Sequence, residues 1–435
     1  MKFPLISKEI KDLFNNKTSL IYFSLLCIII SYSFYSSVDL YSKASVTALG
    51  NPLYAAGFEP VPGVFNPTFG GLFIILSLIA PFLLIGSINN EKKNNTLTLL
   101  VQLPYSIRTI FFTKLLSAII IITVSISFFI PTLFFWHFIG GHIPLKEITL
   151  LISGYFFYGL FIISVSFLSA TLFSSSSGAS ILALFIIMFS WFVDFGKDMN
   201  IIPFLNTMSQ WTITRQMKEF ENGIVSIQAI SFFLLLSSFF SFLSYYLFNL
   251  NIKNKMESIL ITSFIHLLLF TAIMKIHYKL DISESRKTSF SITETKFLKN
   301  LPAIHIKIFL DPTDGRYKDY EKDFLKKLLI IKHKTTVSHA KEKSLSSKYG
   351  IFEYTLNNKS METYSNSAEE IFMIFEDLSG LKMEPTSSTT HFSGFPLVVK
   401  KNWSRYMFIL YLLVLPSIMI YFYYLNNLRR RIYNE

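Results

Sequence analysis

Eight separate apolar runs, most of them close to 20 residues long, constrain the fold of this chain more than any other feature. A helix rises about 1.5 Å per residue, so a run of this length crosses the roughly 30 Å hydrocarbon core of a bilayer. The runs are residues 18–38, 71–88, 111–136, 147–173, 178–195, 228–249, 257–275 and 406–425. Hydrophobic residues make up 51% of the chain and charged residues only 16%, a balance that is rare in soluble domains. The sequence therefore predicts a polytopic α-helical membrane protein with about eight spans.

The basic residues outside these runs predict the orientation of the chain. An even number of spans puts both termini on one side of the membrane, and Lys and Arg are retained on the cytoplasmic side. The basic residues beside the first span, in the loop between spans two and three, and after the last span are Lys2, Lys8, Lys11, Lys17, Lys92, Lys93, Arg108, Arg429, Arg430 and Arg431. We expect a multi-pass protein of the plasma (inner) membrane with both termini in the cytoplasm.

The net charge and the single cysteine narrow the classes of partner and site. Lysine and arginine number 40 against 28 acidic residues, which gives a net charge of +12. In a membrane protein such an excess holds loops inside and contacts anionic lipid, so membrane lipid is an expected partner. No basic, aromatic-interleaved nucleic-acid module is visible, and we expect no nucleic-acid partner. Because Cys27 is the only cysteine, an internal disulfide and a multi-thiolate metal site are excluded.

Two segments outside the spans have helical periodicity. Near the N-terminus, apolar and charged residues alternate at helical spacing, which predicts an interfacial helix on the cytoplasmic face or, alternatively, a charged flank of the first span. The residues concerned are Phe3, Ile6, Ile10, Leu13 and Phe14, with Lys8, Glu9, Lys11 and Asp12 between them. Residues 204–221 predict a re-entrant or interfacial helix on the outer side, with an ordinary loop as the alternative. The Pro- and Gly-rich segment 38–70 is expected to be irregular.

A long polar segment, residues 277–403, separates the seventh and eighth spans. Residues 304–308 alternate like a half-buried strand, 320–329 predict an amphipathic helix, and 351–363 predict a hairpin that turns at Asn357-Asn358. A capping box from Ser367 to Glu370 then begins a helix that Gly380 ends. These elements predict a small α/β or α+β extracytoplasmic domain. The expected divisions are six spans in 1–250, a seventh in 251–276, this domain in 277–403, and the last span with a basic tail in 404–435.

The connection between the second and third spans carries the most specific motif. Residues 88–104 are Ile-Asn-Asn-Glu-Lys-Lys-Asn-Asn-Thr-Leu-Thr-Leu-Leu-Val-Gln-Leu-Pro, a charged cluster followed by a short apolar run. This segment resembles one in ABC-2-type transporter permeases, where an acidic residue, basic residues and a Gly-Thr-Leu stretch precede Leu-Pro. The family usually has Gly in place of Asn95 and an acidic residue near Thr98. In those proteins the segment faces a separate ATPase.

The resemblance implies a set of coupling residues rather than a catalytic site. The chain has no G-x-x-x-x-G-K-[ST] motif, so ATP and Mg²⁺ would be bound by a partner ABC ATPase, and we expect no cofactor, metal or catalytic residue in this chain. The implied ATPase-coupling residues are Lys8, Lys11, Glu91, Lys92, Lys93, Thr96, Leu97, Leu100, Leu103 and Pro104. Glu91 would pair with a basic residue of the ATPase or with Lys11. The alternative is an ordinary charged loop.

The resemblance extends over most of the chain. Residues 1–250 are similar to gliding-motility and copper-maturation permeases, and 259–435 resemble a shortened gliding-motility auxiliary subunit. The implied function is that of an ABC-transporter membrane subunit, coupling ATP hydrolysis by a separate ATPase to export or to extracytoplasmic mechanical work. It would form a homodimer or pair with a related permease, and the outer domain would bind cargo or an extracytoplasmic partner. The alternative is an intramembrane enzyme or sensor with a ligand-binding outer domain.

Three polar residues near the ends of spans are weaker candidates. Asp194 lies at the outer end of the fifth span, where an ionisable group is a functional candidate, but its place beside Lys197 favours an interfacial anchor. His137 and His142 flank two glycines. No further ligand lies next to them in sequence, so we expect no metal site there.

Overall fold

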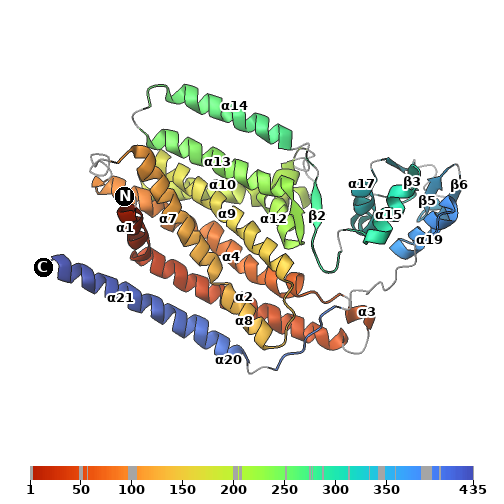
Figure 1. The fold of residues 1–435 in the computed structure, drawn as a ribbon, viewed down its shortest axis with the longest axis horizontal. Helices are drawn as coiled ribbons and strands as arrows, with labels where there is room; N and C mark the ends of the chain where they lie inside the picture. Colours follow the sequence, from red (N-terminus) through yellow and green to blue (C-terminus); the bar gives the residue numbers. More distant parts are fainter. Residues whose placement is uncertain are drawn as a thin grey trace. The chain divides into compact units, whose positions relative to one another are not determined.

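Two units divide the chain in the computed structural model (Figure 1). The first contains Met1–Ile282 and Ser393–Glu435, and the second contains Ser283–Phe392. The structure describes residues 3–434 except 49–51, 56, 97–104, 199–203, 205–207, 250–251, 274–275, 277, 287–288, 312–313, 333, 341–347, 358, 384–393 and 401–402.

Eight segments of the described residues are helical, long enough and apolar enough to cross a membrane. They are Lys17–Ala48, Val61–Lys93, Ile107–Phe138, Leu145–Leu172, Ser176–Asp194, Ile227–Phe248, Lys255–Ile273 and Trp403–Leu425. Each of the eight apolar runs falls on one of these segments. The prediction of a polytopic helical membrane protein is therefore confirmed.

The first unit consists almost entirely of helices. They are α1 (Phe3–Phe14), α2 (Lys17–Ala48), α3 (Pro52–Ala55), η1 (Val61–Phe65), α4 (Asn66–Leu78), α5 (Ala80–Lys93), α7 (Ile107–Ser127), α8 (Ile130–Phe138), α9 (Leu145–Leu172), α10 (Ser176–Asp198), η2 (Ser209–Trp211), α12 (Ile213–Glu221), α13 (Ile227–Phe248), α14 (Lys255–Ile273), α20 (Trp403–Phe408), η4 (Ile409–Val414) and α21 (Leu415–Asn434). Two short strands, β1 (Ile224–Ser226) and β2 (Lys279–Asp281), pair antiparallel.

The expectation of an irregular segment at 38–70 is wrong for most of its described residues. α2 continues to Ala48, and a 2.6 Å ion pair between Lys43 and Asp39 spans one turn of this extension. Pro60 and Pro62 lie at the start of η1, where proline fits because the first N–H groups of a helix have no intrahelical acceptor. The prolines therefore begin helices here instead of breaking them.

α9 lies at the centre of the membrane bundle, with α5, α7, α10, α12 and α13 packed against it (Figure 1). Aromatic side chains fill its contact with α4, where the rings of Tyr158 and Phe73 stack with centroids 4.6 Å apart. On another face Gly154 leaves room for Phe220 of α12, since a Cβ at Gly154 would lie 2.5 Å from that ring. This close packing holds α4 and α12 against α9.

Residues 394–400, which are neither helix nor strand, lie against the C-terminal part of α2, and we call them the strap. The backbone N–H groups of Leu397 and Val399 donate hydrogen bonds to the Oγ atoms of Ser45 and Ser42, at 2.9 and 2.8 Å. The strap precedes the last span in the sequence, so the serine hydroxyls of α2 bind the residues just before that span.

The second unit is a four-stranded sheet with helices. Its strand order is β4-β3-β5-β6, with β3 and β4 parallel and the other pairs antiparallel. The elements are β3 (Ile304–Ile308), β4 (Thr335–His339), β5 (Phe352–Leu356), β6 (Lys359–Thr363), α15 (Ile292–Asn300), α16 (Gly315–Tyr320), η3 (Glu321–Leu325), α17 (Lys326–Ile331) and α19 (Ala368–Ser379). Alternate residues of β3 and β5 share one apolar core with the helices.

The helix α19 begins at the predicted place but lacks the predicted capping box. Ser367 Oγ accepts a hydrogen bond from the N–H of Glu370 at 3.4 Å. The Glu370 carboxylate, however, accepts from the Thr363 hydroxyl of β6 at 2.7 Å. A neighbouring strand therefore supplies the donor that the capping box would have taken from the helix itself. Gly380 ends the helix with a φ of 71°, as expected.

Candidate functional site

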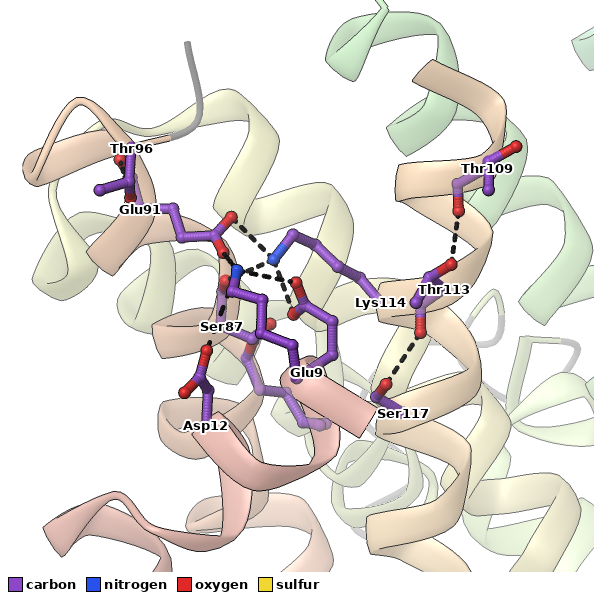
Figure 2. A network of polar contacts seen from close by, with 11 residues as sticks. Glu9, Asp12, Ser87, Glu91, Thr96, Thr109, Thr113, Lys114 and Ser117 are labelled. Atoms are coloured by element: carbon purple, nitrogen blue, oxygen red, sulfur yellow. Dashed lines mark hydrogen bonds and ion pairs between the residues drawn. The ribbon is translucent and has the colours of Figure 1, made fainter. Parts of the chain in front are cut away.

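Four charged residues from three helices meet at one end of the membrane bundle. Lys8 and Glu9 belong to α1, Glu91 to the last turn of α5, and Lys114 to α7. Figure 2 shows the side chains of Glu9, Glu91 and Lys114 pointing toward one another. Lys114 Nζ lies 2.9 Å from Glu9 Oε2 and 2.7 Å from Glu91 Oε2, and Lys8 Nζ lies 3.2 Å from Glu91 Oε1. We call these four residues the charge cluster.

The cluster is charge-balanced and its centre is buried. The side chain of Lys114 is 1% exposed, that of Glu9 is 4% and that of Glu91 is 15%, whereas that of Lys8 is 43% exposed. Lys114 Nζ donates to Glu9 and to the carbonyl of Ser87 at 3.2 Å, and its contact with Glu91 is an ion pair without aligned hydrogen-bond geometry. Removing one member of such a buried set leaves a charge without compensation, which costs about 3–5 kcal/mol.

Glu9 lies in the middle of the apolar face of α1. Leu5, Glu9 and Leu13 are four residues apart, so they share one face of the helix, and all three are buried. The sequence pattern had placed Glu9 among the polar residues between the apolar ones, and this assignment is wrong. Glu9 can be buried because Lys114 reaches it from α7.

Lys8 lies on the solvent-exposed side of the charge cluster. Burial lowers the pKa of Lys8, but the carboxylates of Glu9 and Glu91 raise it by more, so the pKa lies above that of a free lysine. Lys8 is therefore a cation throughout the physiological range. It also lies 3.9 Å from Asp12 on the next turn.

Lys92, the next residue after Glu91, reaches in a different direction. Its Nζ donates to the carbonyl oxygens of Ala170 and Thr171 at 2.6 and 3.2 Å. These carbonyls belong to the last turn of α9, where backbone acceptors have no intrahelical donor and the helix dipole favours a cation. Two consecutive residues thus connect the end of α5 to α1 and α7 through Glu91, and to α9 through Lys92.

The other predicted coupling residues lie outside the cluster or outside the described residues. Lys11, Lys93 and Thr96 are exposed, and Thr96 Oγ1 donates to the carbonyl of Glu91 at 3.4 Å. Glu91 pairs with Lys8 and Lys114 instead of Lys11. The predicted coupling residues outside the described part of the chain are Leu97, Leu100, Leu103 and Pro104. Asn95 has a φ of 56°, which suits a position where the family usually has Gly.

Sequence reasoning missed Glu9 and Lys114, although each left a signal. Lys114 is the one charged residue within the apolar run 111–136, and a lone ionisable residue in a span requires a partner. Glu9 is spaced by four residues from both Leu5 and Leu13. Neither signal identifies the partner, because α1 and α7 are brought together only by the packed bundle.

The weaker candidates have structural contacts. Asp194 accepts a hydrogen bond from the Thr212 hydroxyl at 2.7 Å, and Thr212 is the N-cap of α12. This hydrogen bond connects the C-terminal part of α10 to the start of α12. The predicted helix over 204–221 is split here into η2 and α12. The His142 ring stacks on Phe395 at 3.7 Å, and no group of three or more His, Cys, Asp or Glu in the described residues could hold a metal ion.

Comparison with known proteins gives one family match. Residues 3–278 match the family model described as ABC-2 family transporter protein. The matched region contains the whole charge cluster and Lys92, and it ends before the sheet unit and the last span. Curated proteins and solved structures give no match.

Proposed function

Since this chain belongs to the ABC-2 transporter family and is therefore the membrane subunit of an ABC transporter, we propose that its charge cluster transmits ATP-driven movement from a separate ATPase into the bundle. The partner ATPase would bind ATP and Mg²⁺. The work done would be export of a cargo or mechanical work on the outer side. A homodimer or a pair with a related permease would place two ATPases beneath the membrane.

The buried Lys114 is the observation that carries this proposal. It joins the carboxylates of α1 and α5 from a third helix, α7, so a force on any of the three helices acts on the other two. The chain leaves α5 through the exposed residues Lys93 to Thr96, which belong, like Glu91, to the 88–104 segment that resembles the ATPase-facing motif. A force on this segment would therefore act directly on Glu91 and, through it, on the rest of the charge cluster, as in a rigid-body movement of packed helices.

The membrane orientation belongs to the same proposal. With both termini in the cytoplasm of the plasma (inner) membrane, the charge cluster would face the ATPase and the unit Ser283–Phe392 would lie outside. There it would bind cargo or an extracytoplasmic partner, in line with the resemblance to gliding-motility permeases and their auxiliary subunit.

Two experiments test the proposal. First, purification of the full chain from its native membrane, with its neighbouring gene products, should recover a bound ATPase. Recovery of none would contradict the proposal and favour an intramembrane enzyme or sensor. Second, Glu91→Gln should lower chain-dependent ATP hydrolysis about tenfold while the ATPase remains bound, because coupling between sites is typically worth 5–150-fold.

A matched control separates coupling from a general loss of charge. Glu257 is an exposed glutamate at the start of α14, so Glu257→Gln removes the same charge away from the cluster. We expect hydrolysis in this variant to match that of the unmodified chain. Equal effects of Glu91→Gln and Glu257→Gln would refute a specific role for the cluster. Both variants are assayed well below their melting temperatures.

A further inference from the structure

A cavity of about 630 Å³ lies between α7, α13 and α14, separate from the charge cluster. α14 runs along α13 at the edge of the bundle (Figure 1). The cavity lies at the same end of the bundle as the cluster, because Arg108 on its wall and Lys114 are less than two turns apart on α7. Neither the family match nor the coupling proposal assigns it a role.

One end of the cavity is polar. Arg108 Nε and Asn249 Nδ2 both donate to the hydroxyl oxygen of Tyr245, each at 3.1 Å. Because that oxygen accepts two hydrogen bonds, its own O–H proton is available to another acceptor. Among the described residues, the terminal Nη groups of Arg108 have no acceptor and Arg108 has no carboxylate partner. This end therefore offers several donors and a positive charge that no acidic side chain of the described residues neutralises.

The rest of the cavity wall is mainly apolar, with Ser238, Ser241 and Ser258 also on it, and it opens toward the lipid-facing surface. Phe111, Phe112 and Leu115 line it from α7, and Phe242 lines it from α13. Phe112 is 59% exposed and Phe242 is 45% exposed. α14 has no buried residue, so protein does not enclose this side of the bundle. In a membrane, hydrocarbon chains would cover these rings.

We propose that the cavity binds a phospholipid with an anionic headgroup. The phosphate accepts from the Nη groups of Arg108 and from the Tyr245 hydroxyl, and an acyl chain lies along Phe112 and Phe242. Basic pockets between transmembrane helices have this combination of a charged end and an apolar wall. A free phosphate would contact only the polar end of the cavity. Because the cavity also has an apolar wall, a lipid fits it better than a free phosphate does.

Native mass spectrometry of the full chain in detergent tests the proposal. The probes are phosphatidylglycerol and phosphatidylcholine with identical acyl chains. The unmodified chain should retain phosphatidylglycerol in preference to phosphatidylcholine. Arg108→Gln should lower the affinity for phosphatidylglycerol about tenfold, since charge-assisted hydrogen bonds to the phosphate are lost. Tyr245→Phe keeps the ring and should cause a smaller loss. Phosphatidylcholine retention should not change in either variant, which shows that the cavity is intact.

Three outcomes would overturn the proposal. One is equal retention of phosphatidylglycerol by Arg108→Gln and the unmodified chain. Another is an equal loss in Arg215→Gln, which removes an exposed arginine of α12 and serves as the matched control. The third is displacement of phosphatidylglycerol by millimolar inorganic phosphate, which would identify a free anion as the ligand.

Discussion

Lys114 is the residue on which the balance of the charge cluster depends. Replacing it with Met leaves Glu9 and Glu91 with Lys8 as the remaining cation of the cluster, and Lys8 lies on its exposed side. We expect Lys114→Met to destabilise the membrane unit by about 3–5 kcal/mol, because buried carboxylates lose their compensation. Thermal unfolding of the full chain in detergent measures the change.

Lys93 supplies the control for this prediction, because it is exposed and lies outside the cluster. Lys93→Met should change stability by less than about 0.5 kcal/mol. Adding Glu9→Gln to Lys114→Met should recover part of the loss, since the two residues interact directly. Identical melting temperatures for Lys114→Met and Lys93→Met would show that the ion pairs do not stabilise the bundle.

Asp314 gives a pH-dependent prediction for the sheet unit. Hydrogen bonds from the Tyr349 hydroxyl and from Arg316 lower the pKa of this carboxyl from 3.8 to about 2. Its folded-state pKa is therefore below its unfolded value, so its stabilising contribution is present above pH 3.8 and is lost as the pH falls toward 2. Carboxyl ¹³C shifts of the Asp-labelled chain should titrate near pH 2 in the unmodified protein. In Tyr349→Phe the midpoint should move upward, and an unchanged midpoint would rule out the tyrosine as the cause.

At the scale of single helices, Lys92 stabilises the end of α9 from outside that helix. Lys92→Met removes the donor to two carbonyls of the last turn, and we expect a loss of about 1 kcal/mol. Hydrogen exchange should become faster in the last turn of α9 while its middle stays protected. Exchange that is unchanged relative to Lys93→Met would mean that the last turn does not depend on Lys92.

The contact between α9 and α12 depends on a glycine. A Cβ at Gly154 would lie 2.5 Å from the Phe220 ring, whereas one at Gly70 of α4 meets nothing within 4 Å. We expect Gly154→Ala to destabilise by about 1–3 kcal/mol through overpacking. Gly70→Ala should be neutral or stabilise by about 0.5–1 kcal/mol, because alanine favours the helix. The same melting shift in both variants would contradict this packing.

Some elements and contacts can be predicted from the sequence and others cannot. The spans were predictable because length and hydropathy alone determine whether a helix can cross a bilayer. β4 was not, because it is an edge strand whose residues are mostly exposed and so lack the alternation of a half-buried strand. The partners of Glu370 and Glu9 could not be predicted either. Both depend on side chains from distant elements, Thr363 and Lys114, which become neighbours only in the fold.

For the molecule as a whole, the proposed orientation makes a labelling prediction. Thr96 and Ser360 are exposed, and Cys27, the only native cysteine, is buried. In intact cells a membrane-impermeant maleimide should label Ser360→Cys but label Thr96→Cys only after permeabilisation. The unmodified chain is the control for background from Cys27. Labelling of Thr96→Cys in intact cells would show that the orientation is the opposite of the one proposed.

The strap is one of the contacts through which a movement of α2 would reach the last span. α2 has 32 residues and is therefore about 48 Å long, with α1 before its first turn and the strap against its last turns. The backbone N–H groups of the strap donate hydrogen bonds to serine hydroxyls of α2, and such bonds weaken steeply once the distance or angle departs from the ideal. The Tyr41 hydroxyl of α2 also donates to the carbonyl of Phe395 at 2.6 Å. The ring of Phe34 meets that of Trp403 edge to face, so α2 contacts both the strap and the last span. A tilt of α2 would thus carry the strap and the start of the last span with it.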